Sequence, residues 1–150
     1  MKILLTAINA KYIHSNLAVY SLKAYAQSRV KDSDTEIALA EYTINQQTDD
    51  ILMDIYRRKP DVLCFSCYIW NISYVETVLR EVHKVLPDTK IWLGGPEVSY
   101  DAVAVLKRLP EVTGVMKGEG EETFAELSER TELVGLQGIT WRREDGEIVE

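Results

Sequence analysis

Short apolar runs alternate with helical patterns along most of the chain, and this alternation restricts the possible folds more than any other feature. Five segments have the character of strands: residues 2–8, 36–42, 61–67, 90–93 and 112–116. Five have the apolar spacing of helices: residues 16–30, 48–58, 73–86, 101–108 and 121–130. Alternating strands and helices favour right-handed crossovers and parallel pairing. The pattern predicts an α/β domain with a doubly wound, parallel, five-stranded sheet, flavodoxin-like or Rossmann-like, in the order 2-1-3-4-5.

The last part of the chain breaks this alternation. Residues 138–143 and 147–150 read as two short strands about Asp145-Gly146, a pair typical of tight hairpin turns. We therefore expect a domain over residues 1–133 and a C-terminal β-hairpin connector over residues 134–150. Because the sequence stops in a strand-like run, we also expect it to be a fragment of a longer protein.

Composition excludes several classes of partner. The 150 residues include 24 acidic and 17 basic side chains, for a net charge of −7. This balance argues against a surface for nucleic acid or an anionic membrane. No apolar run approaches the ~20 residues that span a bilayer. Cys64 and Cys67 are too few for a disulfide framework, so we expect a cytoplasmic protein with reduced thiols.

Two glycine-rich loops follow the predicted fourth and fifth strands. They are Gly94-Gly95-Pro96-Glu97 and Gly118-Glu119-Gly120-Glu121. In open parallel sheets, ligands bind at the carboxyl ends of the strands, and glycine permits positive φ and close backbone approach. The acidic side chains suit a helix N-terminus but repel a phosphate. The loops predict a crevice for a ligand with neutral groups, and an ordinary tight turn or plain helix capping remains the alternative.

The loop after the first strand is long and polar, and it carries Asn9, His14 and Ser15. It lacks the Gly-x-Gly-x-x-Gly fingerprint, and no Gly-Lys-Ser/Thr occurs in the chain, so the usual dinucleotide and P-loop sites are not indicated. His14 could ligate a metal or cofactor. A single loop histidine is more often solvated or bonded to backbone, so the metal ligand stays undetermined.

The third predicted strand leads into Ser66 and then Tyr68, Ile69 and Trp70. Apolar side chains at a strand exit predict a wall against an apolar ligand, or packing against a helix or a further domain. The Cys64-x-x-Cys67 spacing is better read as two buried residues than as a redox or zinc motif, because zinc needs two more ligands. No nucleophile–base pair or carboxylate pair has suitable spacing, so no catalytic residue is predicted.

Several segments together resemble one known family. The segments are Lys2–Leu5, Asn16–Leu22, Pro60–Ser66, Trp92–Glu97 and Gly118–Phe124. In this order and spacing, the sequence resembles the N-terminal cobalamin (B12)-binding domain of B12-dependent radical S-adenosylmethionine (SAM) proteins over residues 1–130.

The resemblance implies that the cobalamin tail, with its dimethylbenzimidazole displaced from cobalt, enters the crevice. Gly94, Gly95, Pro96 and the Gly118–Glu121 loop would line it, and Ser66 would face the tail or its phosphate. Asp-x-His-x-x-Gly, which supplies the cobalt ligand in methionine synthase-type domains, is absent after the first strand. Tyr68, Ile69 or Trp70 would then shield the lower face of cobalt.

The resemblance also implies the chemistry of the whole protein, which would be methyl transfer or a related radical reaction. The chain has no Cys-x-x-x-Cys-x-x-Cys, so the 4Fe–4S iron–sulfur cluster and S-adenosylmethionine are expected only in a downstream radical SAM domain of the same polypeptide. The chain itself would be a cofactor-binding module rather than a complete enzyme, with cobalamin and that domain as partners, and neither nucleic acid nor membrane.

Two alternatives belong to other classes. One is a flavodoxin-like signalling or interaction domain without a cofactor. A receiver domain needs an acidic cluster after the first strand and an aspartate ending the third, where this chain has Asn9 and Ser66. The other is a flavin- or nucleotide-binding domain, which the missing phosphate-binding loop after the first strand disfavours.

Overall fold

The structure, a computed structural model, describes residues 1–10, 17–29, 35–118, 120–129 and 133–150. Its strands, in chain order, are β1 (Lys2–Asn9), β2 (Glu36–Thr43), β3 (Val62–Ser66), β4 (Lys90–Gly94), β5 (Gly114–Met116), β6 (Ile139–Arg142) and β7 (Ile148–Val149). Its helices are α1 (Leu17–Arg29), α2 (Thr48–Arg58), α3 (Ile72–Val85), α4 (Pro96–Ser99), α5 (Ala102–Arg108) and α6 (Glu121–Glu129).

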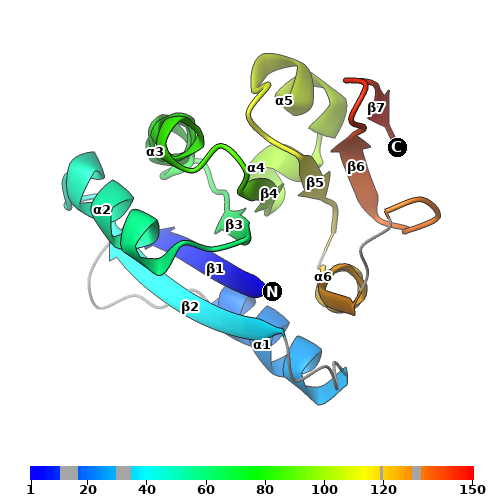
Figure 1. Cartoon of the computed structure of the whole chain (residues 1–150), viewed down its shortest axis with the longest axis horizontal. Coiled ribbons are helices and arrows are strands. Elements are labelled where there is room, and N and C mark those ends of the chain that lie inside the picture. Colours follow the sequence, from blue (N-terminus) through cyan, green and yellow to red (C-terminus); the bar gives the residue numbers. More distant parts are fainter. Residues whose placement is uncertain (11–16, 30–34, 119, 130–132) are drawn as a thin grey trace.

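The described strands form one sheet in the order β2-β1-β3-β4-β5-β6-β7 (Figure 1). The first five pair in parallel, which confirms the predicted order 2-1-3-4-5. The predicted C-terminal hairpin is also present. Its first strand pairs antiparallel with β5, so the hairpin extends the sheet to seven strands instead of standing apart from it.

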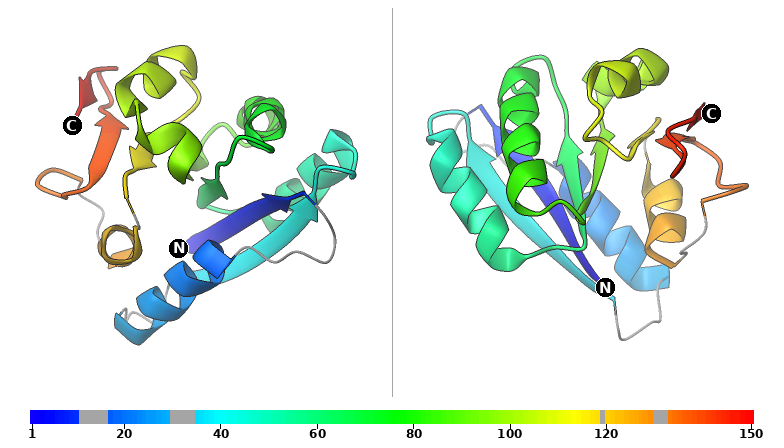
Figure 2. Two further views of the ribbon diagram at one scale, coloured as in Figure 1. Left: turned by 180° about the vertical axis from the view of Figure 1, so that it is seen from behind. Right: turned by 45° about the horizontal axis from the view of Figure 1, so that its top comes forward.

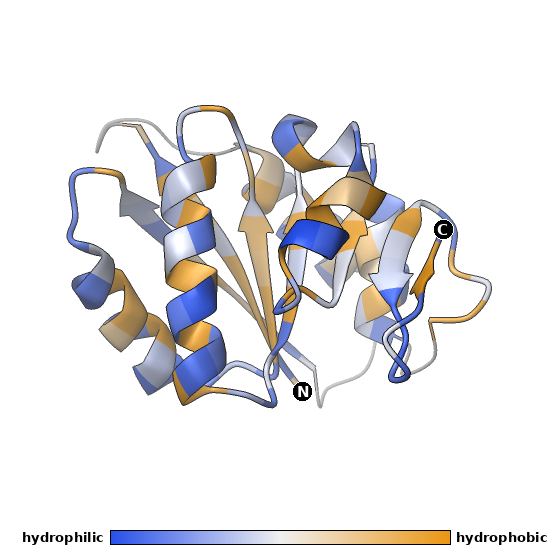
Figure 3. Ribbon diagram, turned by 90° about the horizontal axis from the view of Figure 1, so that it is seen from above, coloured by the Kyte–Doolittle hydropathy of each residue, from blue (hydrophilic) through white to orange (hydrophobic). Residues whose placement is uncertain are grey.

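Helices cover both faces of the sheet, as a doubly wound fold requires (Figure 2). On one face, α2, α3 and α5 bury Ile51, Val75 and Leu106 against the strands. On the other face, α1 and α6 contact each other and bury Val19 and Phe124. The central strands are apolar along their length, whereas the covering helices carry apolar and polar stripes (Figure 3). Burial on both faces explains why these strands read as nearly continuous apolar runs.

One helix was not predicted. The segment after β4 was expected to be a loop, but Pro96 begins the single turn of α4. Proline suits the first turn of a helix because its φ is already helical and its missing N–H has no partner there. Cys67, predicted as the end of a strand, lies one residue beyond β3.

Asn71 connects the carboxyl ends of two central strands. Its side-chain amide donates to the carbonyl oxygens of Ile8 (2.9 Å) and Ser66 (3.0 Å) and accepts from the N–H of Tyr68 at 2.8 Å. The residue is 1% exposed. Because β1 and β3 are the strands at which the chain reverses its direction across the sheet, this one side chain braces the edge where ligands bind in such folds.

No helix in the described ranges is both long and apolar enough to cross a membrane.

Replacing Asn71 with alanine should lower the free energy of unfolding by roughly 2–4 kcal/mol, because three buried main-chain groups lose their partner. Urea denaturation followed by circular dichroism measures the change. Asn45→Ala, at an exposed turn position, is the matched control and should have little effect. A loss at Asn71 no larger than that of the control would contradict this role.

Candidate functional site

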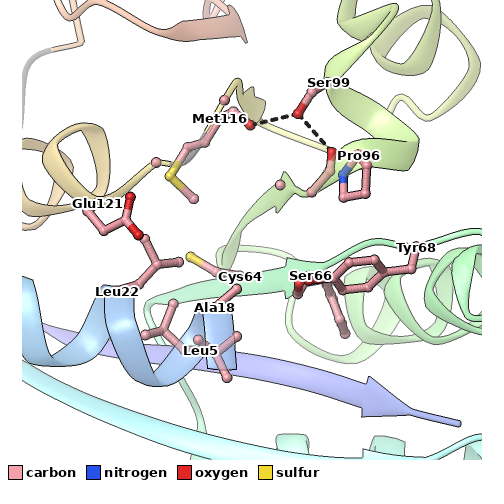
Figure 4. Close-up of a pocket in the computed structure, with 16 residues that line it drawn as sticks. Leu5, Ala18, Leu22, Cys64, Ser66, Tyr68, Pro96, Ser99, Met116 and Glu121 are labelled. Atoms are coloured by element: carbon pink, nitrogen blue, oxygen red, sulfur yellow. Dashed lines mark hydrogen bonds between the residues drawn. The ribbon is translucent and has the colours of Figure 1, made fainter. Parts of the chain in front are cut away.

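A cavity of about 530 Å³ lies at the carboxyl ends of β1, β3, β4 and β5, on the face covered by α1 and α6 (Figure 4). This volume falls in the usual range for small-molecule sites. Three helices, α2, α3 and α5, pack against the opposite face of the sheet, whereas two, α1 and α6, pack against the face that holds the cavity. The lining residues are Leu5, Ala18, Val19, Leu22, Cys64, Phe65, Ser66, Tyr68, Gly94, Gly95, Pro96, Ser99, Met116, Gly118, Gly120 and Glu121.

The strand register explains why space remains there. Ala7 pairs with Ser66, and Ser66 pairs with Gly94, so three small residues lie side by side near the strand ends. One step down the same face of the sheet, Leu5 pairs with Cys64. Side chains alternate between the two faces of a sheet, so the side chains of Leu5, Ala7, Cys64 and Ser66 point to the α1 and α6 side, where Gly94 carries none. The small row leaves room that larger side chains would fill.

Burial separates the floor of the cavity from its rim. Leu5, Val19, Cys64 and Met116 are each at most 5% exposed and form the floor. The rim includes the exposed Pro96. The floor is therefore apolar, and it is built from β1, α1, β3 and β5.

Gly95 and Gly94 have different roles although they are adjacent. Gly95 has φ of +102°, and a Cβ there would lie 3.0 Å from the backbone nitrogen of Cys67 and closer still to its carbonyl oxygen. A Cβ on Gly94 would meet only the Met116 carbonyl oxygen, at 3.7 Å, an ordinary contact. Gly95 is thus required by the fold itself, whereas the bare backbone of Gly94 leaves cavity space.

The glycines of the second loop also adopt positive φ, +75° at Gly118 and +84° at Gly120. The loop is held at both ends by the segment before β6. The N–H of Lys117 donates to the Gly138 carbonyl at 2.8 Å, and the Thr123 hydroxyl donates to the Gln137 carbonyl at 3.2 Å. The start of the hairpin therefore supports one wall of the cavity.

Polar side chains are few in the lining. The Ser99 hydroxyl bonds to the Gly95 carbonyl at 2.7 Å and lies 3.5 Å from the Met116 carbonyl. Glu121 accepts a hydrogen bond from the Ser21 hydroxyl at 3.2 Å. Ser66, at the end of β3, is 9% exposed. An entering ligand thus meets mainly apolar surface, with polar atoms carried by the loop backbone and by a few side chains, those of Ser66, Tyr68, Ser99 and Glu121.

The aromatic loop after β3 contributes one residue to the lining. Tyr68 lines the cavity and stacks on Trp70, with ring centroids 4.4 Å apart and planes inclined by 7°. Trp70 is 50% exposed and Ile69 is 79% exposed. These two side chains lie outside the cavity lining.

Eight of the residues predicted to bind a ligand line this one cavity: Ser66, Tyr68, Gly94, Gly95, Pro96, Gly118, Gly120 and Glu121. Four other predicted residues, Asn9, Ile69, Trp70 and Glu97, do not line the described cavity. Asn9 is 8% exposed and donates to Glu41 at 3.3 Å, away from the lining. The predictions for His14, Ser15 and Glu119 concern positions outside the described residues.

Sequence reasoning missed the other half of the lining: Leu5, Ala18, Val19, Leu22, Cys64, Phe65, Ser99 and Met116. Alternation along β1 and β3 could have assigned Leu5 and Cys64 to one face. It could not show which face lacks a covering helix.

The two cysteines are free and buried, as predicted. Burial raises the pKa of Cys64 to about 12 and also raises the pKa of Cys67. Both thiols are therefore neutral near pH 7, and Cys64 presents an uncharged sulfur to the cavity. In the described part of the chain, no three His, Cys, Asp or Glu side chains gather in a way that could hold a metal ion.

Gly95→Ala should lower the free energy of unfolding by roughly 2–4 kcal/mol, since the added Cβ is strained by both its φ and the Cys67 backbone. Gly94→Ala is the matched control and should change stability by less than about 1 kcal/mol. Chemical denaturation of the two variants tests this. Equal losses would show that the geometry at Gly95 carries no special cost.

The buried thiols predict a loss of stability in alkali. Their folded pKa values lie above the ordinary value near 9, so the unfolded chain releases protons first as pH rises. Between pH 9 and pH 10, stability should fall by up to about 1 kcal/mol per thiol. Thermal unfolding measures the fall. A Cys64→Ala/Cys67→Ala variant, although less stable at pH 7, should lose this part of the pH dependence; an unchanged slope would refute the assignment.

Comparison with known proteins identifies a family for this fold and cavity. The B12 binding domain family matches residues 3–128. Among curated proteins, the cobalamin-dependent radical SAM methyltransferase TokK of Streptomyces tokunonensis is 32% identical over 90 residues, covering 57% of this chain and 13% of TokK.

Two solved structures share the fold. The cobalamin-dependent SAM radical enzyme OxsB, with aqua-cobalamin and SAM bound, superposes with a TM-score of 0.77 at 17% identity, over 99% of this chain and 22% of OxsB. The radical SAM methyltransferase TsrM from Kitasatospora setae gives 0.74 at 17% identity, over 97% of this chain and 29% of TsrM. This chain therefore spans less than a third of each of these three relatives. The match over residues 3–128 confirms the predicted family and its cofactor class, and the chain belongs to the B12 binding domain family.

Proposed function

We propose that the cavity binds the nucleotide tail of a cobalamin, with the corrin ring lying across the carboxyl ends of the strands. The observation that carries this proposal is the row of Ala7, Ser66 and Gly94, which leaves open space beside two glycine-rich loops. A flat heterocycle needs bare backbone on its flanks, and Gly94 and Gly118 supply it. The volume and the apolar floor fit such a group.

The polar lining supports the orientation of the tail. Ser66 stands at the end of β3, between the buried floor and the rim, and would face the tail or its phosphate. Glu121 lies at the start of α6, and its carboxylate would repel a phosphate. The phosphate is therefore expected on the Ser66 side, and neutral hydroxyl or amide groups of the tail on the Glu121 side.

The aromatic pair supports a role beneath the corrin. Tyr68 and Trp70 stack on each other at the end of β3, and Trp70 presents half of its surface to solvent. Together with Ile69, this pair would shield the lower face of cobalt. His14, the other residue considered there, lies outside the described residues.

We infer a role in methyl transfer for the whole protein, because the relatives reported above are named as radical SAM enzymes or methyltransferases. When bound, cobalamin supplies a cobalt centre that can carry and donate a methyl group. This chain's residues would bind the tail, exclude water from it and present the corrin to a radical SAM domain in the same polypeptide. That domain would hold the iron–sulfur cluster and S-adenosylmethionine.

We also propose that the chain divides into two functional parts. Residues 1–133 would form the cofactor-binding domain, and residues 134–150 would connect it to the radical SAM domain. Hydrogen bonds join Lys117 and Thr123 to the start of the hairpin, so the proposed connector is attached directly to one wall of the cavity. The two reduced cysteines favour a location in the cytoplasm.

Mixing the purified chain with hydroxocobalamin, removing free ligand by gel filtration and recording the visible spectrum tests the function. The chain should retain corrinoid absorbance. Gly94→Val should weaken binding at least tenfold, since its methyl groups enter the cavity. Ala104→Val adds a similar branch at an exposed position of α5 and should bind like the unmodified chain.

Two results would contradict the proposal. One is a folded chain that retains no corrinoid. The other is a folded Gly94→Val variant that binds as tightly as the Ala104→Val control, which would place the tail elsewhere. Circular dichroism of each variant establishes that it is folded.

A further inference from the structure

We propose that the cavity floor selects the base at the end of the tail, favouring one with a hydrocarbon edge over a purine. The inference rests on the proposed function, because it concerns the same cavity. The tails of natural corrinoids differ in their base, so a cavity could bind a corrinoid without selecting one base over another.

The floor offers an entering ring no strong hydrogen-bonding side chain among its described residues. Leu5, Val19, Cys64 and Met116 are lining residues at most 5% exposed, and none carries an oxygen or nitrogen in its side chain. Phe65 is buried as well, but its ring packs in the core of the opposite face. Figure 4 shows Leu5, Cys64 and Met116 reaching into the same space from β1, β3 and β5. Leu22 adds a further methyl-rich wall from α1.

Backbone groups at that depth are also committed. Leu5 pairs with Cys64 in the parallel ladder, and Cys64 pairs with Trp92 on its other side. Met116 lies in β5, where it pairs with Ile139 of β6. The lining side chains that carry oxygen, Ser66, Tyr68, Ser99 and Glu121, lie at the end of β3 and in the segments that follow β3, β4 and β5 rather than in the floor.

The two classes of base differ on the edge that would meet this floor. Dimethylbenzimidazole presents two methyl groups and ring carbons. Adenine presents ring nitrogens and an amino group, which lose water on entering and find no partner. A polar group that is buried without a partner loses its hydrogen bonds to water and gains none in return, so its burial is unfavourable. The benzimidazole form should therefore bind at least roughly tenfold more tightly, a difference of about 1.4 kcal/mol.

Cys64 is the residue through which this selectivity can be tested most directly. It is 3% exposed, its thiol is uncharged, and a thiol is only a weak donor and acceptor. Serine has nearly the same shape but carries a hydroxyl that both donates and accepts strongly. Cys64→Ser thus adds one polar partner to the floor with little change in volume.

The experiment measures the dissociation constants of two probes by spectroscopic titration: cobalamin, and the otherwise identical corrinoid that carries adenine as its base. The unmodified chain should prefer cobalamin at least tenfold. In Cys64→Ser the preference should shrink at least threefold. Cys67→Ser makes the same exchange at a buried thiol that packs in the core on the opposite face, and it should keep the original preference.

The outcomes separate this inference from the proposed function. If neither corrinoid binds the folded chain, the proposed function fails and this inference fails with it. If both bind with affinities within threefold of each other, the proposed function stands and the selective floor is refuted. An unchanged preference in Cys64→Ser would also refute the role of the floor at Cys64. Should that variant not fold, the ratio measured on the unmodified chain still decides.

Discussion

The parallel register of β1, β3 and β4 is the constraint on which the site depends. It sets Ala7 beside Ser66 and Ser66 beside Gly94, so that small residues from three distant parts of the chain form one row. The row lies at the carboxyl ends, where parallel sheets open into loops. A shift of one residue in any of these strands would turn its side chains to the opposite face and close the space.

The loops hold this row open by two different means. At Gly95 the chain passes so close to the Cys67 backbone that a side chain is excluded, and this approach ties the ends of β3 and β4 together. At Gly94 the missing side chain is itself the useful feature, because it leaves volume. Asn71 adds a third tie, between β1 and β3. Close backbone contacts and buried hydrogen bonds thus surround the cavity and keep the strand ends in place around it.

The hairpin has a structural role that its position in the sequence does not reveal. β6 pairs with β5. Arg142 donates to the carbonyl oxygen of Leu106, in the last turn of α5, and to those of Leu109 and Val112, which follow that helix. Positive charge suits the C-terminal end of a helix, where carbonyl groups lack partners. The segment predicted as a connector is therefore also an integral edge of the sheet.

The sequence by itself determined the fold class, the strand order and the importance of the two glycine-rich loops. Alternating apolar runs and helical patterns admit few topologies, and glycine pairs at strand ends are local signals that need no knowledge of distant residues. Only the tertiary structure decided which side chains form the floor. Leu5, Val19 and Met116 read as ordinary core residues in the sequence, and they meet at the cavity because register and unequal helix cover bring them there. The tertiary structure also decided that Tyr68 lines the cavity whereas Ile69 is exposed to solvent. The path of a loop between two elements depends on packing that no local sequence pattern encodes.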